Sequence, residues 1–111
     1  MRNSHASVEV LEVAPGRFDV RGALTFNTAR RARDTGLRYF RASEVPEIEV
    51  SCAGVTQVDS AGLAVLLDWL AFAKSNHRGM RFKDLPGSLL AIARISEVES
   101  LLEEGVAAPS L

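Results

Sequence analysis

The run from Ala61 to Ala73 is apolar except at Asp68, and it directly follows a strand-like segment. On a helical wheel its large side chains spread over an arc of about 220°, which is wider than one sheet face covers. The sequence therefore predicts a helix over residues 61–76 that packs on a sheet and on neighbouring helices at once. The run is too short to cross a bilayer, which needs about 20 residues.

The remaining arc of this helix carries only short side chains. Its positions are Ala61, Ala64, Asp68, Ala71 and Ser75. Another protein could approach such a face closely, because little side-chain entropy would be lost there. The alternative is that water covers this face, as on an ordinary surface helix. The sequence leaves both interpretations open.

The junction Val58-Asp59-Ser60-Ala61-Gly62-Leu63 places a carboxylate and a hydroxyl side by side at the start of this helix. Unpaired backbone N–H groups and the positive end of the helix dipole occur there. Phosphorylation of Ser60 would add about −1.5 to −2 charges beside Asp59 and would change which surface can dock. The alternative is that Asp59 or Ser60 acts only as the N-cap.

Four segments have the pattern of strands. Val8–Val13 and Arg17–Arg21 flank Ala14-Pro15-Gly16, so they predict a hairpin in which Gly16 has a positive φ. Apolar and polar residues alternate in the second segment, in Ile48–Cys52 and in Met80–Lys83. Strands with one polar face each predict a sheet that helices cover on one side only.

A first helix is predicted from Thr25 to Phe40, with Thr25 or Asn27 as its N-cap. Its expected buried face carries Phe26, Ala29, Gly36, Leu37 and Phe40. After residues 61–76, His77-Arg78-Gly79 is expected to end the helix, with Gly79 supplying a positive φ.

Two more helices are predicted near the end of the chain. Leu85-Pro86-Gly87-Ser88 opens one that continues through Ile95. Ser96 and Glu99 have the spacing of a capping box for a short helix that stops near Gly105. The residues from Val106 onward are expected to form a frayed tail.

The element order β-β-α-β-α-β-α-α predicts an α/β fold of two layers. We expect a mixed four-stranded sheet, in which an N-terminal hairpin is followed by βαβ crossovers, with helices on one face. At 111 residues, of which 47% are hydrophobic, the chain is expected to form one domain over residues 1–111. The expected core covers about residues 7–104, between flexible ends.

Composition and motifs narrow the function classes. A net charge of −1 gives no electrostatic case for nucleic acid. The single Cys52 excludes an internal disulfide and is expected to be a buried strand residue, while His5 and His77 lack metal-ligand spacing. No phosphate loop, dinucleotide fingerprint or nucleophile elbow is present. We therefore expect no catalysis, no cofactor and no metal. The polar N-terminus lacks a secretory apolar region, which favours a cytoplasmic location.

Asp59-Ser60-Ala61-Gly62-Leu63, with a strand before it and a glycine-bounded strand after its helix, resembles the STAS domain. This family includes anti-sigma-factor antagonists and the tails of sulfate transporters. Gly22–Ala29, Val58–Leu70 and Leu85–Ser96 are similar to its MlaB-type members, which are cytoplasmic STAS subunits of phospholipid-transporting ABC systems. The resemblance covers nearly the whole chain and implies a STAS-like sandwich.

The resemblance also implies a function. The start of the second helix would dock on an ABC ATPase subunit in a transporter that maintains outer-membrane lipid asymmetry. The protein would then lie at the inner face of the inner membrane, held there by the complex. Alternatively, it would be an anti-sigma-factor antagonist switched by phosphorylation of Ser60. Ala61 favours the transporter subunit, because antagonists commonly carry a second serine at that position. Homodimer formation is left open.

The expected partner-binding residues follow from the junction, the small face and the basic first helix. They are Asp59, Ser60, Ala61, Gly62, Ala64, Asp68, Arg30 and Arg33, the two arginines being included because the resemblance implies that the start of the first helix lies beside Ser60. Arginines also occur at positions 31, 38 and 41, so this helix could bind an acidic partner or anionic lipid headgroups. The alternative is a solvated face. Trp69 is expected in the core, with an interface anchor as the alternative.

Overall fold

The computed structural model describes residues 7–109. Its elements are β1 (Val8–Ala14), β2 (Arg17–Leu24), α1 (Ala29–Ala42), β3 (Glu47–Val58), α2 (Ser60–Ser75), β4 (Gly79–Lys83), α3 (Gly87–Ile95) and α4 (Glu99–Glu104). The sheet order is β1-β2-β3-β4. β1 and β2 are antiparallel, whereas β2–β3 and β3–β4 are parallel. The predicted mixed sheet of an α/β fold is therefore confirmed.

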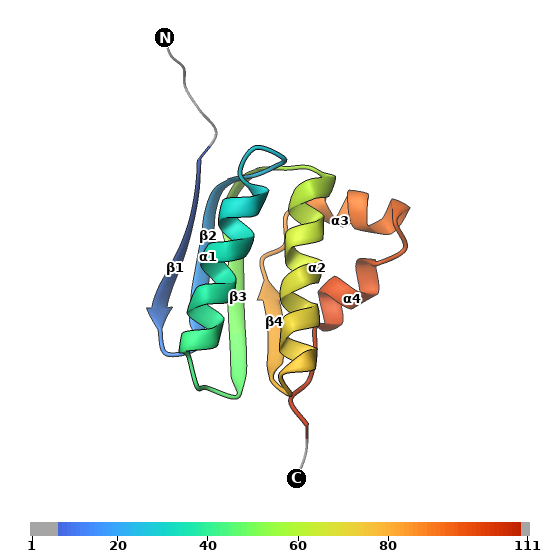
Figure 1. Cartoon of the computed structure of the whole chain (residues 1–111). Coiled ribbons are helices and arrows are strands. Elements are labelled where there is room, and N and C mark those ends of the chain that lie inside the picture. Colours follow the sequence, from blue (N-terminus) through green and yellow to red (C-terminus); the bar gives the residue numbers. More distant parts are fainter. Residues whose placement is uncertain (1–6, 110–111) are drawn as a thin grey trace.

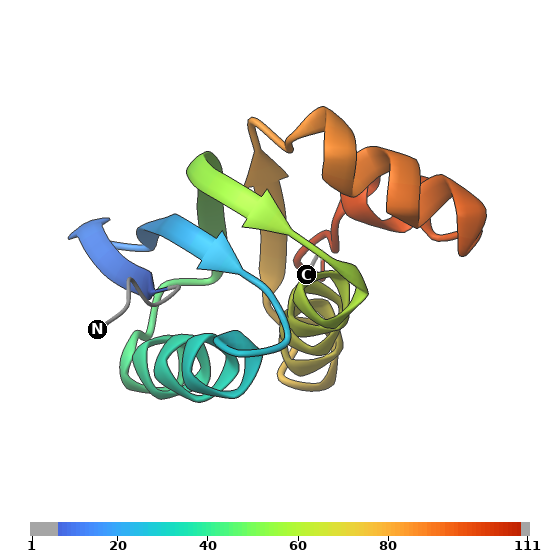
Figure 2. The same ribbon diagram turned by 90° about the horizontal axis from the view of Figure 1, so that it is seen from above.

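α1 and α2 form a layer on one side of the sheet (Figures 1 and 2). α1 and α2 lie side by side against the same face, and α3 and α4 lie beyond β4 (Figures 1 and 2). The apolar members of the strand alternation, Phe18, Val20, Val50 and Met80, are all buried beneath this layer. The parallel strands bring the end of β3, and with it the start of α2, next to the end of β2.

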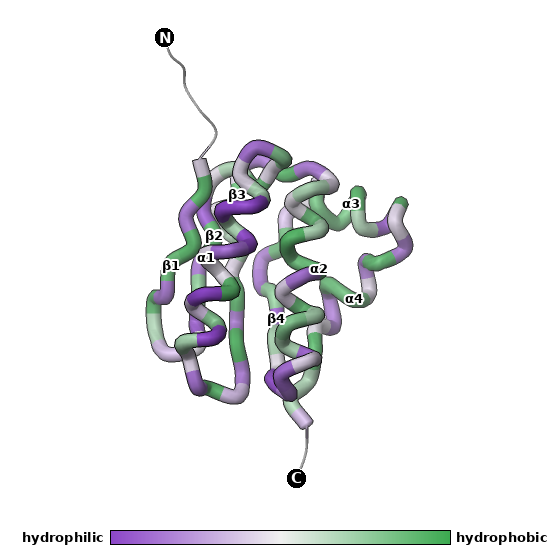
Figure 3. Tube along the Cα trace, viewed as in Figure 1, coloured by the Kyte–Doolittle hydropathy of each residue, from purple (hydrophilic) through white to green (hydrophobic). Residues whose placement is uncertain are grey.

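Hydropathy distinguishes the two helices of this layer. The α2 trace is hydrophobic along most of its length, whereas α1 alternates between hydrophobic and hydrophilic residues (Figure 3). Phe40 of α1 lies at the centre of an aromatic cluster, with ring centroids 5.1 Å from Phe18 and 5.3 Å from Trp69 in edge-to-face geometry. Such pairs add about 0.5–1.5 kcal/mol each beyond their buried area.

The start of α1 differs from the prediction. The helix begins at Ala29, and neither Thr25 nor Asn27 caps it. Instead, Thr28 closes a turn: its Oγ1 accepts a hydrogen bond from Thr25 N at 3.0 Å and donates one to Ala23 O at 2.6 Å. Phe26 therefore lies outside the helix and is 80% exposed, so its predicted place on the buried face was wrong.

The end of α2 also needs a correction. The helix stops at Ser75, and the positive φ belongs to His77, at 57°. Gly79 is instead the first residue of β4, where its N–H donates to Pro46 O at 2.8 Å. The chain therefore turns into the strand without the glycine stop that the sequence suggested.

The C-terminal elements keep their predicted positions but not their predicted contacts. Ser96 is the C-cap residue of α3, and the N-cap residue of α4 is Val98, which makes no side-chain cap hydrogen bond. The predicted capping box is therefore not formed in the described residues. Glu99 accepts from Arg94 Nη2 at 2.9 Å instead. Val106 is not frayed, because it exchanges two 2.8 Å backbone hydrogen bonds with Met80 of β4.

Candidate docking surface

Asp59 joins the start of α2 to the turn before α1. It is the N-cap residue of α2, and its Oδ1 accepts from Ala61 N at 2.9 Å and Gly62 N at 3.1 Å. Its Oδ2 accepts from Phe26 N at 3.0 Å. One carboxylate therefore satisfies two free N–H groups of the helix and fixes the turn that presents the Phe26 ring.

The electrostatics of Asp59 follow from these contacts. Its partial burial opposes ionisation, but the backbone hydrogen bonds from Phe26, Gly62 and Ala61 outweigh that effect and lower the pKa of Asp59 below its ordinary value. The side chain is consequently a carboxylate at neutral pH, and it accepts hydrogen bonds at the positive end of the α2 dipole.

Ser60 is the first residue of α2 and is exposed. Within residues 7–109, its hydroxyl takes part in no hydrogen bond, because Asp59 supplies the cap. Of the two capping alternatives left by the sequence, the structure selects Asp59. The Ser60 hydroxyl is thus free to meet solvent or another protein.

Gly62 is not exposed at the protein surface, although it was expected to contact a partner. It is buried, and a Cβ at this position would lie 2.0 Å from the carbonyl oxygen of Leu24, the last residue of β2. The absence of a side chain lets α2 begin directly against the end of β2. Its role is therefore close packing of α2 against β2.

A hollow of about 350 Å³ lies between α1 and α2 next to Ser60. Arg30 and Arg33 line it from α1, Ala61, Ala64 and Asp68 line it from α2, and Phe26 borders it. The structure thus brings together five of the residues that the sequence singled out for partner binding. Their role in docking remains a prediction. We call the exposed Phe26 and Ser60, together with this hollow, the α2-start surface.

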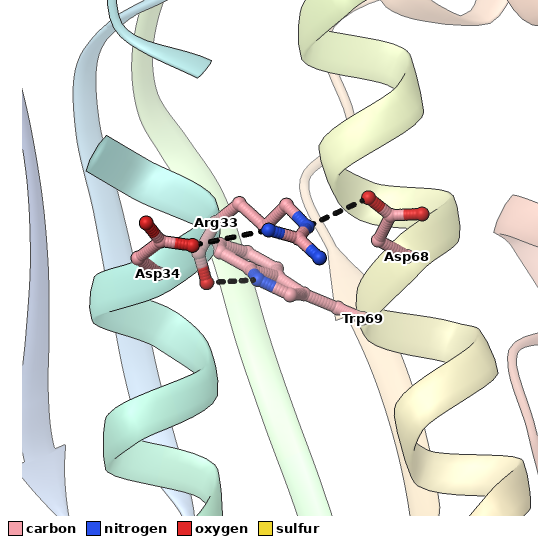
Figure 4. Close-up of polar contacts among 4 residues, drawn as sticks. All are labelled: Arg33, Asp34, Asp68 and Trp69. Atoms are coloured by element: carbon pink, nitrogen blue, oxygen red, sulfur yellow. Dashed lines mark hydrogen bonds and ion pairs between the residues drawn. The ribbon is translucent and has the colours of Figure 1, made fainter. Parts of the chain in front are cut away.

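Arg33 and Asp68 bridge the two helices across the hollow (Figure 4). Arg33 Nε donates to Asp68 Oδ2 at 3.0 Å, and its Nη1 donates to Asp34 Oδ1 at 3.1 Å. The Arg33 and Asp68 side chains are 47% and 53% exposed, so this ion pair adds little to stability. The ion pair orients Asp68, the one acidic residue among the described residues that line this hollow, toward Arg33.

Trp69 holds α1 and α2 at a short separation and is fully buried, as the core interpretation predicted. Its indole Nε1 donates to Arg33 O at 3.3 Å (Figure 4). The ring lies over Gly36, where a Cβ would come within 2.5 Å of the indole. The packing of Trp69 on Gly36 therefore sets the spacing of α1 and α2.

Phe26 is the surface residue that sequence reasoning missed. Its spacing from Ala29 suggested a helical buried face, but Thr25, Asn27 and Thr28 are residues that favour turns and caps over helix interiors. That local signal could have placed the helix start later and left the ring outside.

No helix over residues 7–109 is both long and apolar enough to cross a membrane. No group of three His, Cys, Asp or Glu side chains in that range could hold a metal ion. Cys52 is buried, and desolvation raises the pKa of its thiol to about 12, with a smaller contribution from Asp84.

Comparisons with known proteins agree with this architecture. Residues 9–103 match the family described as "Mlab, STAS domain". No curated protein matches the chain significantly. Among solved structures, the anti-sigma factor antagonist SpoIIAA in its unphosphorylated form is similar, with a TM-score of 0.67 over 84% of this chain and 83% of that chain. At 13% identity this second likeness concerns the fold alone. Because the family match spans nearly all of the described residues, the chain belongs to the MlaB-type STAS domain family.

Proposed function

We propose that this protein is a non-enzymatic accessory subunit that binds the cytoplasmic ATPase of a phospholipid-transporting ABC system through the α2-start surface. It would work at the inner face of the inner membrane and serve outer-membrane lipid asymmetry. The family membership supports the choice of partner, and the exposed surface supports the way of binding.

The observation that carries the proposal is the ordered exposure of Phe26. An aromatic ring that is 80% exposed contributes little buried apolar area to the free protein, and phenylalanine is among the residues enriched in the cores of protein–protein interfaces. The turn around it is fixed by Asp59 and Thr28, so little entropy is lost when a partner covers the ring. Exposed Ala64 beside it lets the partner backbone approach closely.

The contribution of such a subunit is a binding free energy. A protein that binds the assembled ATPase more tightly than the separated or unfolded ATPase shifts the population toward the assembled form. No acid, base or nucleophile on this chain takes part in the proposed function.

The test is reconstitution with the ATPase and permease subunits of the phospholipid ABC system encoded in the same genome. We expect the native protein to co-purify with them and Ala64→Arg to lose binding while keeping its thermal stability. Ala91→Arg is the matched control, since Ala91 is an exposed alanine on α3, away from the surface. A native protein that does not bind this ATPase would refute the proposal.

A second candidate rests on the free hydroxyl of Ser60. Because Ser60 is exposed and Asp59 provides the cap, a kinase could transfer the γ-phosphoryl group of ATP to Oγ without disturbing the helix. The protein would then be an anti-sigma-factor antagonist whose docking ends on phosphorylation. Incubation with the anti-sigma kinases of the same genome, followed by mass spectrometry, tests this function. If Ser60 carries no phosphate and the protein binds none of these kinases, this function is excluded.

A further inference from the structure

We infer that the docking surface continues along the whole junction of α1 and α2 and receives an acidic amphipathic helix of the partner. This inference rests on the proposed function, because it names the part of the partner that the same surface would bind. It starts from a second hollow, of about 300 Å³, that follows the first between the two helices. Arg33 and Asp68 line both hollows and their ion pair crosses between them, so the two hollows adjoin along one junction, which we call the α1–α2 groove.

The α2 side of the groove is suited to another helix. Small side chains follow each other at alternating spacings of three and four residues, at Ala61, Ala64, Asp68, Ala71 and Ser75. This spacing keeps them on one face, as in the contact line of a coiled coil. From Ala61 to Ser75 the face is about 21 Å long, which corresponds to about four turns of a partner helix.

The charge of the groove selects an acidic partner. Arg30, Arg33 and Arg41 line it, against Asp68 as its single carboxylate. Within the described range, Arg30 and Arg41 enter none of the six salt bridges, so their charge is not neutralised inside this chain. They lie near opposite ends of α1 and would attract carboxylates at both ends of a partner helix.

The groove also offers an apolar contact at each end. Phe26 borders the first hollow, and Phe72, which is partly buried, lines the second. The guanidinium carbon of Arg41 lies 5.8 Å from the centroid of the Phe72 ring, so this arginine is held beside the apolar contact. A partner helix that matches the groove thus has apolar residues on one face and carboxylates along the edge that faces α1.

The test measures the affinity of the purified protein for the ATPase subunit of the phospholipid ABC system. Arg41→Glu and Ala71→Glu change only the second hollow, and each is expected to weaken binding by about tenfold or more. Ala71→Gln has nearly the same size without the charge and should bind more tightly than Ala71→Glu. Arg31→Glu is the control, because Arg31 is an exposed arginine of α1 that lines neither hollow. It should change affinity by less than about twofold.

The outcomes separate this inference from the proposed function. If Ala64→Arg abolishes binding while Arg41→Glu and Ala71→Glu bind like the native protein, the inference is wrong and the proposed function stands. If the native protein does not bind the ATPase, the proposed function fails instead. Light scattering of the purified protein tests whether a second copy of the chain fills the groove. If the native protein self-associates and Arg41→Glu abolishes that association, the inference is overturned.

Discussion

Replacing Asp59 by alanine tests the link between the start of α2 and the Phe26 turn. The substitution removes one N-cap, which costs about 0.5–2 kcal/mol. It also removes the hydrogen bond from Phe26 N, worth about 0.5–1.5 kcal/mol, at the lower end here because water can replace the acceptor. The expected loss of unfolding free energy is about 1–3 kcal/mol. For a domain of this size, that corresponds to a decrease in Tm of about 5–15 °C.

Asp59→Asn separates the charge from the geometry. The amide keeps an oxygen that can cap Ala61 and Gly62, but its NH₂ group cannot accept from Phe26. We therefore expect a smaller loss of stability than for alanine. Urea denaturation followed by circular dichroism gives both free energies. A docking assay should show weaker partner binding for both variants, because the turn is no longer fixed.

The pH dependence gives an independent check. The pKa of Asp59 is lower in the folded protein than its ordinary value of 3.8. A depressed pKa stabilises the fold above the unfolded value, and this contribution is lost as pH falls through the folded pKa. The stability difference between native protein and Asp59→Asn should therefore be constant near neutrality and shrink below about pH 4. An unchanged difference down to pH 2, or a native-like Asp59→Ala, would refute this account.

Three further experiments test other parts of the structure. Gly36→Ala should lose about 1–3 kcal/mol of unfolding free energy in urea denaturation, because its Cβ would lie 2.5 Å from the Trp69 ring. Gly87→Ala is the control and should be neutral or stabilising, because nothing lies within 4 Å of its Cβ. Equal stabilities of the two variants would contradict the packing described. Cys52 should not react with a disulfide reagent at pH 8 until urea unfolds the protein, since burial raises the pKa of its thiol to about 12. Phe26→Ser should change stability by less than about 0.5 kcal/mol but weaken ATPase binding by about 2 kcal/mol, measured by calorimetry; unchanged affinity would remove this ring from the surface.

Local pattern was enough to predict the strands and most of the helices. Alternation of period two identifies the buried side of Phe18 and Val20 because successive strand side chains point to opposite faces. The apolar arc of α2 correctly predicted that Trp69 is buried and that Ala64 is exposed. These features depend on residues close in sequence, so the sequence contains them directly.

Boundaries were less predictable where a contact from elsewhere in the chain decides them. The predicted first helix included Phe26, but a hydrogen bond from Phe26 N to Asp59, 33 residues away, holds this segment as a turn. In the same way, Val106 was expected to be frayed because its partner, Met80, belongs to a different element. Local propensity cannot include such contacts.

The sequence by itself determined which strand side chains and which side of α2 face the core, the order of the elements, and the carboxylate and hydroxyl that begin α2. Only the tertiary structure decided that Asp59 is the cap, that Gly62 is buried against β2, and that Arg33 faces Asp68 across a groove. The physical reason is that periodicity fixes the direction of a side chain relative to its own element. The distance between two elements depends on how their side chains pack, and here that is set by the Trp69 ring over Gly36.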